Sequence, residues 1–579
     1  MRSGASSQIL REIFAQTRSP AFTKYVTKLL VELCSINTTP NPDVNKMRAT
    51  EDACFRILER ELGGLKHTGA RLERRSINPA IQTHPNYSLL HFTKTANRPQ
   101  GLAPEEVYDK RTNLLYIIPG TGTKRPGNSI ALNAHLDVVA PYLPPRVRNG
   151  IVYGRGACDD KGPVVGLVAG LKVLSDVVGK TGLPWNRNIV AMFVVEEETG
   201  GNGSLSLAID RELKKLYDSV LVSECTGLQL HPANRGAVWY RAEIRPPAGV
   251  SAFEMFAFII EEMEKEGAAI RAESRHRLFP QRPVQTCHGI IGHFGEHPSR
   301  ICGKMSFVIR FEKPSSQTIL DLVDDCLAAG LAAYIGLYGD KTKVTDPATH
   351  KPMVARHYDV NTQGKELQVD VFGAAGHMGS IRERDGAITK AACLVQCLVF
   401  SKPKFEQLGA VFSLELAAGQ AGDRSLVLEG GQGFVPTHDI TEVMSRIEKA
   451  ARRGAEYFLR RVGRSEPVED VVKVTYEKLH NVAFDGAVDS PAMVDAIKAA
   501  RSCDIWKDEP VLGWTVSCDA RLFATEYPGM PVLTFGPGQL VHAHSDREQI
   551  QIDEIRAAAE FIAIFLLIHT GTVQSWPAQ

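Results

Sequence analysis

The sequence lacks an excess of charge of either sign. Its 67 basic and 66 acidic residues leave a formal net charge of +1 at pH 7. This balance gives no electrostatic reason to expect a nucleic-acid partner or binding to an anionic membrane surface. We therefore expect neither kind of partner.

Long hydrophobic runs are also missing. The longest apolar stretches, such as FIAIFLLI near the C-terminus, are too short to span a bilayer. The opening MRSGASSQILREIF lacks the apolar core of a secretory signal. We expect an intracellular, cytoplasmic protein with no membrane partner.

Cysteine pairs at metal-binding spacing are absent. The eleven cysteines are an odd number and include no CxxC pair. This argues against a disulfide framework and against a thiolate zinc site. Most of these cysteines are expected to be buried thiols that behave as small apolar residues.

The order of apolar patterns predicts one α/β domain interrupted by a long insertion. At 579 residues the chain is too long for a single core. Helical and strand patterns alternate up to residue 235, where a helical run from Gly162 lies between strand-like runs as in a βαβ unit. The same alternation resumes at 481. Residues 1–235 and 481–579 are therefore assigned to one domain, and residues 236–480 to an insertion.

The insertion contains two coarsely similar segments, residues 236–336 and 365–465. Each is read as a strand, a helix, a glycine-rich turn and a strand, with HGIIGHFG as the turn of the first segment. The stretch LYGDKTKVTDPATHKP, from Leu337, is read as the loop between them. This pattern predicts a duplicated α+β unit.

Acidic and imidazole residues follow the apolar runs that are expected to be buried strands. They are His135 and Asp137, Asp159 and Asp160, Glu197 and Glu198, Glu224, and His544. Buried charges are costly unless they are paired or bound to a metal, and ligands of open α/β sheets bind at the carboxyl ends of strands. Together these residues supply nitrogen and oxygen ligands for two zinc-like ions that share a carboxylate.

Each element of this set also has a purely structural interpretation. His135 and Asp137, two apart on a strand, would face the same side, and the pair could serve stability alone. Asp159 and Asp160 could present a carboxylate to a cation or cap the following helix. Glu196 to Glu198 could form a solvated acidic turn, although three adjacent carboxylates require a cation or a raised pKa, as a general base does.

The motifs HLD, GRGACDDKGP, EEETGG, SEC and AHSDRE resemble the signatures of the di-zinc amidohydrolases. That family includes carboxypeptidases, dipeptidases, aminoacylases, acetylornithine deacetylase and succinyl-diaminopimelate desuccinylase. The resemblance implies an α/β catalytic domain with a mostly parallel sheet, interrupted by an α+β, ferredoxin-like lid. It also implies two zinc ions as cofactors, with cobalt or manganese as alternatives in vitro.

The resemblance implies roles for individual residues. Asp159 would bridge the two metals, Asp137 would orient a ligand, and Glu197 would be the general base. Asp160 follows the bridging residue, where the family often has a cis peptide bond. The remaining metal ligands would be His135 and Glu224 on one ion and Glu198 and His544 on the other.

In the lid, GAAGHMGS resembles the family segment whose histidine stabilises the oxyanion, which assigns that role to His377. Gly249 stands opposite His377 in the first segment. Because the lid resembles the duplicated lid of the bacterial dipeptidases, we expect a monomer if the duplication holds and a homodimer otherwise. Arg382, Arg384 and Arg521 are candidates for binding a substrate carboxylate.

The reaction implied is hydrolysis of an amide bond in a small peptide, as by a dipeptidase or carboxypeptidase. An N-acyl amino acid deacylase would use the same metals and is the alternative. A non-enzymatic binding module would be expected to lack a ligand or the base, and Glu197 and every ligand are present. A nucleotide-binding protein is disfavoured because no strand–GxGxxG–helix unit occurs.

Overall fold

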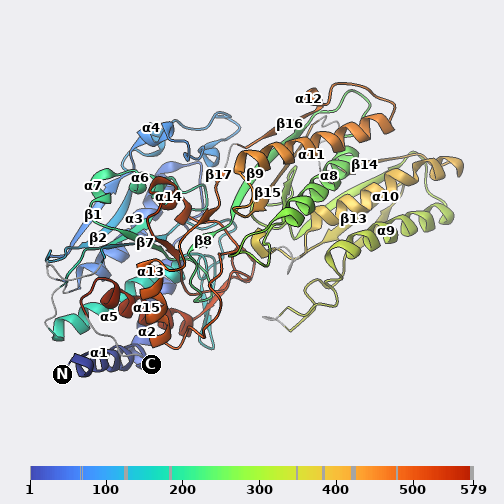
Figure 1. Ribbon diagram of the computed structural model, residues 1–579. Coiled ribbons are helices and arrows are strands. Elements are labelled where there is room, and N and C mark those ends of the chain that lie inside the picture. Colours follow the sequence, from blue (N-terminus) through green and yellow to red (C-terminus); the bar gives the residue numbers. More distant parts are fainter. Residues whose placement is uncertain are drawn as a thin grey trace. The chain divides into compact units, whose positions relative to one another are not determined.

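The computed structural model describes residues 2–65, 67, 69–122, 128–181, 185–346, 350–380, 385–418, 425–476 and 480–573. Contacts divide the chain into two compact units (Figure 1). The first comprises Met1–Gly236, His276–Gln281 and Lys478–Gln579, and the second Ala237–Arg275 and Arg282–Glu477. The short piece His276–Gln281 belongs to the first unit because, for example, the Gly513 amide donates to the Leu278 carbonyl.

A six-stranded sheet forms the centre of the first unit, in the order β1-β2-β6-β3-β7-β19. The pairs β6/β3, β3/β7 and β7/β19 are parallel, whereas β1 and β2 are antiparallel. The mostly parallel α/β class predicted from the sequence is confirmed. The strands are β1 (Arg71–Ser76), β2 (Thr112–Ile118), β3 (Ile130–His135), β6 (Ile189–Val194), β7 (Ser219–Val222) and β19 (Val532–Thr534).

The three central strands, β6, β3 and β7, could be predicted from the sequence because every residue in them is buried. Parallel strands covered by helices on both faces need apolar side chains at almost every position. The smaller strands of this unit are β4 (Arg146–Arg148), β5 (Ile151–Tyr153), β8 (Ala233–Asn234), β17 (His480–Asn481), β18 (Phe484–Asp485) and β20 (Gln549–Gln551).

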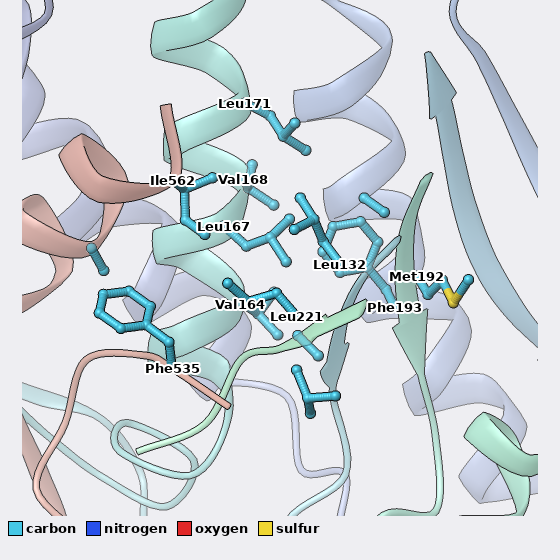
Figure 2. Packing of buried hydrophobic residues seen from close by; sticks show 14 of the residues in the cluster. Leu132, Val164, Leu167, Val168, Leu171, Met192, Phe193, Leu221, Phe535 and Ile562 are labelled. Carbon is cyan, nitrogen blue, oxygen red and sulfur yellow. The ribbon is translucent and has the colours of Figure 1, made fainter. Parts of the chain in front are cut away.

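Helix α5 (Lys161–Thr181) crosses from β5 to β6 and packs against α15 (Ile552–His569). Figure 2 shows Val164, Leu167 and Leu171 of α5 among side chains of the sheet, with Ile562 of α15 beside the same helix. By length and composition, α5 could cross a membrane, but 83% of its apolar window is buried inside the structure. Its composition is that of a core helix between a sheet and a second helix.

The first unit contains eight further α-helices among the described residues. They are α1 (Arg2–Thr17), α2 (Pro20–Cys34), α3 (Val44–Gly63), α4 (Pro104–Val107), α6 (Asn202–Ala208), α7 (Arg211–Lys214), α13 (Pro491–Ser502) and α14 (Ala520–Glu526).

The second unit contains two sheets, each with a pair of helices (Figure 1). The first sheet has the order β10-β15-β9-β16, with helices α8 and α11 packed together. The second has the order β12-β13-β11-β14, with α9 and α10 packed together. The first set is β9 (Gly236–Ile244), α8 (Ala252–Glu273), β10 (Thr286–Ile291), β15 (Leu426–Phe434), α11 (Ile440–Arg461), α12 (Val468–Val471) and β16 (Val472–Thr475). The second set is β11 (Lys304–Phe311), α9 (Gln317–Tyr338), β12 (Tyr358–Gln363), β13 (Glu366–Phe372), α10 (Ala387–Gln407) and β14 (Phe412–Leu416).

Each sheet with its helices follows the ferredoxin-like order, and each takes one half from either segment of the chain. The half β9–α8–β10 pairs with β15–α11–β16, and β11–α9–β12 pairs with β13–α10–β14. The predicted repeats, residues 236–336 and 365–465, thus contribute to both sheets.

Two local predictions in the insertion are wrong in part. The first half of the predicted turn HGIIGHFG, residues 288–291, is part of strand β10, which pairs antiparallel with β15 in spite of a register shift beside Gly289. The predicted loop from Leu337 begins later, because α9 continues to Tyr338 and ends at Gly339, whose φ of 77° favours glycine.

Candidate metal centre

The carboxyl end of β3 brings His135 and Asp137 together. The strand ends at His135, so the prediction that both residues lie on it is wrong for Asp137. His135 Nδ1 lies 3.0 Å from the Asp137 backbone carbonyl oxygen and 3.4 Å from its carboxylate. The carboxylate also accepts the backbone N–H groups of Glu197 (3.1 Å) and Glu198 (2.9 Å). Asp137 therefore fixes His135 and the acidic turn together.

Asp159 lies between the two predicted histidine ligands. Its Oδ1 is 3.2 Å from Nε2 of His135, and its Oδ2 is 3.3 Å from Nε2 of His544. Burial alone would raise the pKa of Asp159, but the hydrogen bonds from the two imidazoles outweigh it and hold that pKa well below its usual range. The two oxygens of one carboxylate thus face two separate groups of side chains.

Two groups of potential metal ligands share this aspartate. The first comprises His135, Asp159, Asp160 and Glu224, the second Asp159, Glu198 and His544, and within each group the ligand atoms lie within 4.8 Å of one another. All five residues predicted as ligands are in these groups, and all are buried. The structure adds Asp160, which the sequence left open as a ligand or a helix cap.

The charges of these groups suit divalent cations. Burial, followed by the neighbouring carboxylates, raises the pKa of Glu224 well above its ordinary value, and burial also raises that of Glu198. Burial opposes charge on His544, yet Glu198 and Asp159 raise its pKa to about 9. Bound protons here balance the negative charge of the crowded, buried carboxylates. A metal ion that displaces those protons from the histidines would balance the same charge. The donor set, nitrogen and oxygen without thiolate, fits this exchange.

The three glutamates after β6 point to different partners. Glu196, with a φ of 68°, turns away from the ligand groups and pairs with the buried guanidinium of Arg111, while its Oε2 accepts the Tyr108 hydroxyl at 2.9 Å. Arg111 is also paired with Glu51 at 2.6 Å. The sequence could not reveal this compensating cation.

Glu197 stays beside the ligand groups. Its carboxylate is 4.0 Å from His135 Nε2. Burial is the largest cause that raises its pKa well above the ordinary value, and Asp519 and Glu198 add to the shift, whereas His135 opposes it. A carboxylate with a raised pKa is suited to accept and return a proton near neutral pH.

The glycine-rich turn before α5 is held by a residue that the sequence analysis missed, Glu548. Its Oε1 accepts the backbone N–H groups of Gly156, Cys158 and Asp159 at 2.9 to 3.0 Å, and its Oε2 pairs with Arg155. Glu548 closes the quoted motif AHSDRE, so a buried acid opposite a turn rich in free N–H groups was the available signal. The peptide bond between Asp159 and Asp160 is cis, as the resemblance implies.

Asp160 combines a backbone and a side-chain role. Its carbonyl accepts the Val164 N–H and so begins α5, while its Oδ2 accepts the backbone N–H of His135 at 3.2 Å. Its Oδ1 is buried and has no hydrogen-bond partner among the described residues. An acceptor of this kind within a ligand group fits a cation.

Two further charged residues, Asp519 and Arg521, lie at the start of α14. The sequence did not indicate Asp519 and left the role of Arg521 open. Asp519 is buried near Glu197, on which its charge acts. Arg521, one of three candidate carboxylate anchors, is buried and donates from Nη2 to the Gly200 carbonyl at 3.0 Å. Its Nε and Nη1 have no hydrogen-bond partner among the described residues. Arg382 and Arg384 lie outside the described residues.

His377 lies in the second unit, between β13 and α10, and is buried. It follows the end of β13 (Phe372) by the same number of residues as Gly249 follows the end of β9 (Ile244). The Gly379 backbone N–H donates to His377 Nδ1 at 2.9 Å. A neutral ring therefore carries its proton on Nε2.

Known proteins resemble this chain over its sequence and its fold. Human carnosine dipeptidase 1 has a TM-score of 0.54 at 13% identity and covers 97% of this chain and 99% of its own. The dipeptidase Dug1p of Saccharomyces cerevisiae has a TM-score of 0.55 at 14% identity, covering 98% and 99%. At these identities the likeness shows the fold.

A relative detected by sequence is the putative LysW-lysine/LysW-ornithine hydrolase of Pyrobaculum aerophilum, 28% identical over 223 residues. That match covers 38% of this chain and 59% of the relative's length. The model of peptidase family M20/M25/M40 matches residues 131–567, which include both ligand groups and the whole second unit. The chain therefore belongs to peptidase family M20/M25/M40.

Proposed function

We propose that this protein is a di-zinc peptidase that cleaves the amide bond of small peptides, as a dipeptidase or carboxypeptidase does. The observation that carries the proposal is the sharing of Asp159 by two ligand groups, with Glu197 beside both. Imidazole and carboxylate ligands suit zinc. One ion would be held by His135, Asp159 and Glu224, with Asp160 behind them, and the other by Asp159, Glu198 and His544.

When bound, two such ions lower the pKa of a water molecule and polarise the scissile carbonyl. Glu197 takes the proton of that water and delivers it to the leaving nitrogen, a task for which its raised pKa is suited. His377 would donate a hydrogen bond from its Nε2–H to the oxyanion. Loss of one such donor costs about 3 kcal/mol of barrier.

A substrate carboxylate needs a cationic partner, and Arg521 is our candidate. Its Nε and Nη1 are buried and have no hydrogen-bond partner among the described residues. Each of these charged donors would form a strong hydrogen bond to a carboxylate oxygen. The Gly200 carbonyl, which accepts from Nη2, holds the guanidinium in place.

Removal of an acyl group from an N-acyl amino acid is the second candidate. The name of the Pyrobaculum relative, a LysW-lysine/LysW-ornithine hydrolase, favours an amino acid released from a larger conjugate. The names of the structural relatives favour dipeptides. The same metal ligands serve both reactions, so substrate preference distinguishes them.

The test combines elemental analysis with hydrolysis of matched dipeptides and N-acetyl amino acids, before and after chelation. We expect two zinc ions per chain and chelator-sensitive cleavage, with dipeptides preferred. Glu197→Ala should lower kcat by at least about a thousandfold, because proton transfer is lost, and Glu197→Gln should do the same while both metals remain. A Glu197→Ala enzyme with wild-type kcat, or a protein that binds no zinc after reconstitution, would overturn the proposal.

We also propose that the protein is a monomer in the cytoplasm. Both halves of each lid sheet come from one chain, which leaves no half for a second subunit to supply. Sedimentation equilibrium measures the mass directly, and a dimer would contradict this proposal.

A further inference from the structure

Residues of the first repeat bind the segment that carries His377. The Ile301 amide donates to the Gly376 carbonyl at 2.9 Å, and the Met378 amide donates to the Ser299 carbonyl at 2.8 Å. These contacts fix the chain on both sides of the histidine. They leave the carbonyls of Met378 and Gly379 to other donors.

Gln285 is the side chain that binds those two carbonyls. Its Nε2 donates to the Met378 oxygen at 3.2 Å and to the Gly379 oxygen at 2.6 Å. Gln285 directly precedes β10, so it sits at the end of the first lid sheet, and its own carbonyl accepts the Gly433 amide of β15 at 2.9 Å. A side chain anchored in this way has little freedom to move.

The peptide unit that Gln285 holds also sets the state of the histidine ring. The Gly379 N–H donates to His377 Nδ1 at 2.9 Å. If the peptide plane after Met378 rotated, this donor would leave Nδ1, and the neutral ring could then place its proton on either nitrogen. By binding the carbonyls on both sides of that N–H, Gln285 opposes the rotation.

The matching position of the first repeat shows the contrast. Gly249 occupies the place of His377 there, and a Cβ at Gly249 would meet nothing within 4 Å among the described atoms. In the histidine-bearing segment, by contrast, the Met378 side chain lies beside Gly431. The first repeat has no histidine at this position. It supplies Gln285, whose side chain binds the two carbonyls that follow His377.

We propose that Gln285 is a positioning residue of the enzyme: it keeps His377 as the Nε2–H tautomer that an oxyanion donor requires. The proposal rests on the hydrolase function proposed above. No part of it requires Gln285 to touch the substrate.

The test replaces Gln285 with glutamate, which has the same shape but carries two acceptors in place of the amide donor. We expect kcat to fall about tenfold with KM and metal content unchanged, because a small displacement of a donor weakens the transition state more than the ground state. In the His377→Ala background the same change should cause no further loss. Long-range ¹H–¹⁵N spectra should show His377 Nδ1 unprotonated in the wild type and mixed tautomers in Gln285→Glu.

Thr286→Val is the matched control. Thr286 is the next residue, is buried and donates to Gln432 at 2.7 Å, so its loss also removes one buried hydrogen bond, but not one to the His377 segment. Its kcat and His377 spectrum should stay those of the wild type. Wild-type kcat and ring signals in Gln285→Glu would overturn the proposal, as would an equal loss in Thr286→Val. If His377→Ala keeps full kcat, the oxyanion role fails, and the tautomer spectra alone then decide whether Gln285 positions the ring.

Discussion

At the scale of single residues, burial of a neutral histidine makes the stability of the first unit sensitive to acid. His231 is buried, and its Nδ1 donates to the Leu512 carbonyl at 2.9 Å. Burial outweighs this hydrogen bond and lowers the pKa of His231 to about 4. The unfolded imidazole takes up a proton as the pH falls through about 6.5, whereas the folded one does so only near its own pKa. The free energy of unfolding therefore falls with the pH in this window and is fully retained above it.

His231→Asn should remove this acid sensitivity, because the amide N–H can replace Nδ1 without taking up a proton. Between pH 7.5 and pH 5 the wild type should lose about 2 kcal/mol more than the variant. The melting temperature of both proteins at the two pH values measures the difference, and other titrating groups cancel. Parallel losses in the two proteins would show that His231 does not titrate in this window.

The acidic turn after β6 shows how far single residues can be predicted. Three adjacent carboxylates at the end of an apolar strand predict that at least one of Glu196, Glu197 and Glu198 needs a cation or a raised pKa. Only the fold reveals that Arg111, distant in sequence, compensates Glu196. The other two glutamates remain beside the ligand groups. Strand ends are local features, whereas the choice of partner is not.

At the scale of elements, the packing of α5 on α15 depends on the absence of side chains at two helix positions. A Cβ on Gly170 would lie 2.7 Å from Cγ2 of Ile562, whereas one on Gly166 would lie 3.3 Å from the nearest atom. Gly179, in the same helix, is exposed, and its Cβ would meet nothing within 4 Å among the described atoms. The same substitution should therefore have opposite effects along one helix.

Gly170→Ala should lower the melting temperature, because overpacking this contact costs about 1–3 kcal/mol. Gly179→Ala should raise it slightly, because alanine in an exposed helix gains up to about 1 kcal/mol over glycine. Thermal unfolding of the two variants beside the wild type measures both signs. A stabilised Gly170→Ala protein would show that the helices can move apart without cost.

Helices and strands that are buried on both faces could be predicted from the sequence. The elements of the second unit could be predicted less completely. The apolar runs of β3, β6 and β7 and the helix α5 follow from burial on every side. In the second unit the repeated pattern was visible, but the reciprocal pairing of halves is set by contacts between distant strands. Strand register and partner choice are tertiary properties, so the sequence pattern predicts a turn for HGIIGHFG although its first half forms β10.

At the scale of the whole molecule, uncompensated buried charge is concentrated in the first unit. Its two ligand groups crowd carboxylates whose pKa values are raised by burial. The second unit also has a cluster of potential ligands, Glu273, His438 and Glu442, but both of its glutamates are exposed and Arg446 pairs with Glu273. A divalent cation that binds only the folded state should therefore stabilise the first unit and leave the second unchanged.

Chelation should separate the two units in a hydrogen-exchange experiment on the intact protein. With EDTA at pH 7.5, amide exchange should quicken in peptides that contain residues 135–137, 196–200, 222–226 and 543–548, since loss of the cations leaves their carboxylates without compensation. Peptides around 270–275 and 436–446 should exchange as before, because the guanidinium of Arg446 cannot be chelated. Restoring zinc should reverse the change. Equal acceleration in both units would mean that the ions stabilise the whole chain, and no change in the first unit would mean that its carboxylates are compensated without a metal.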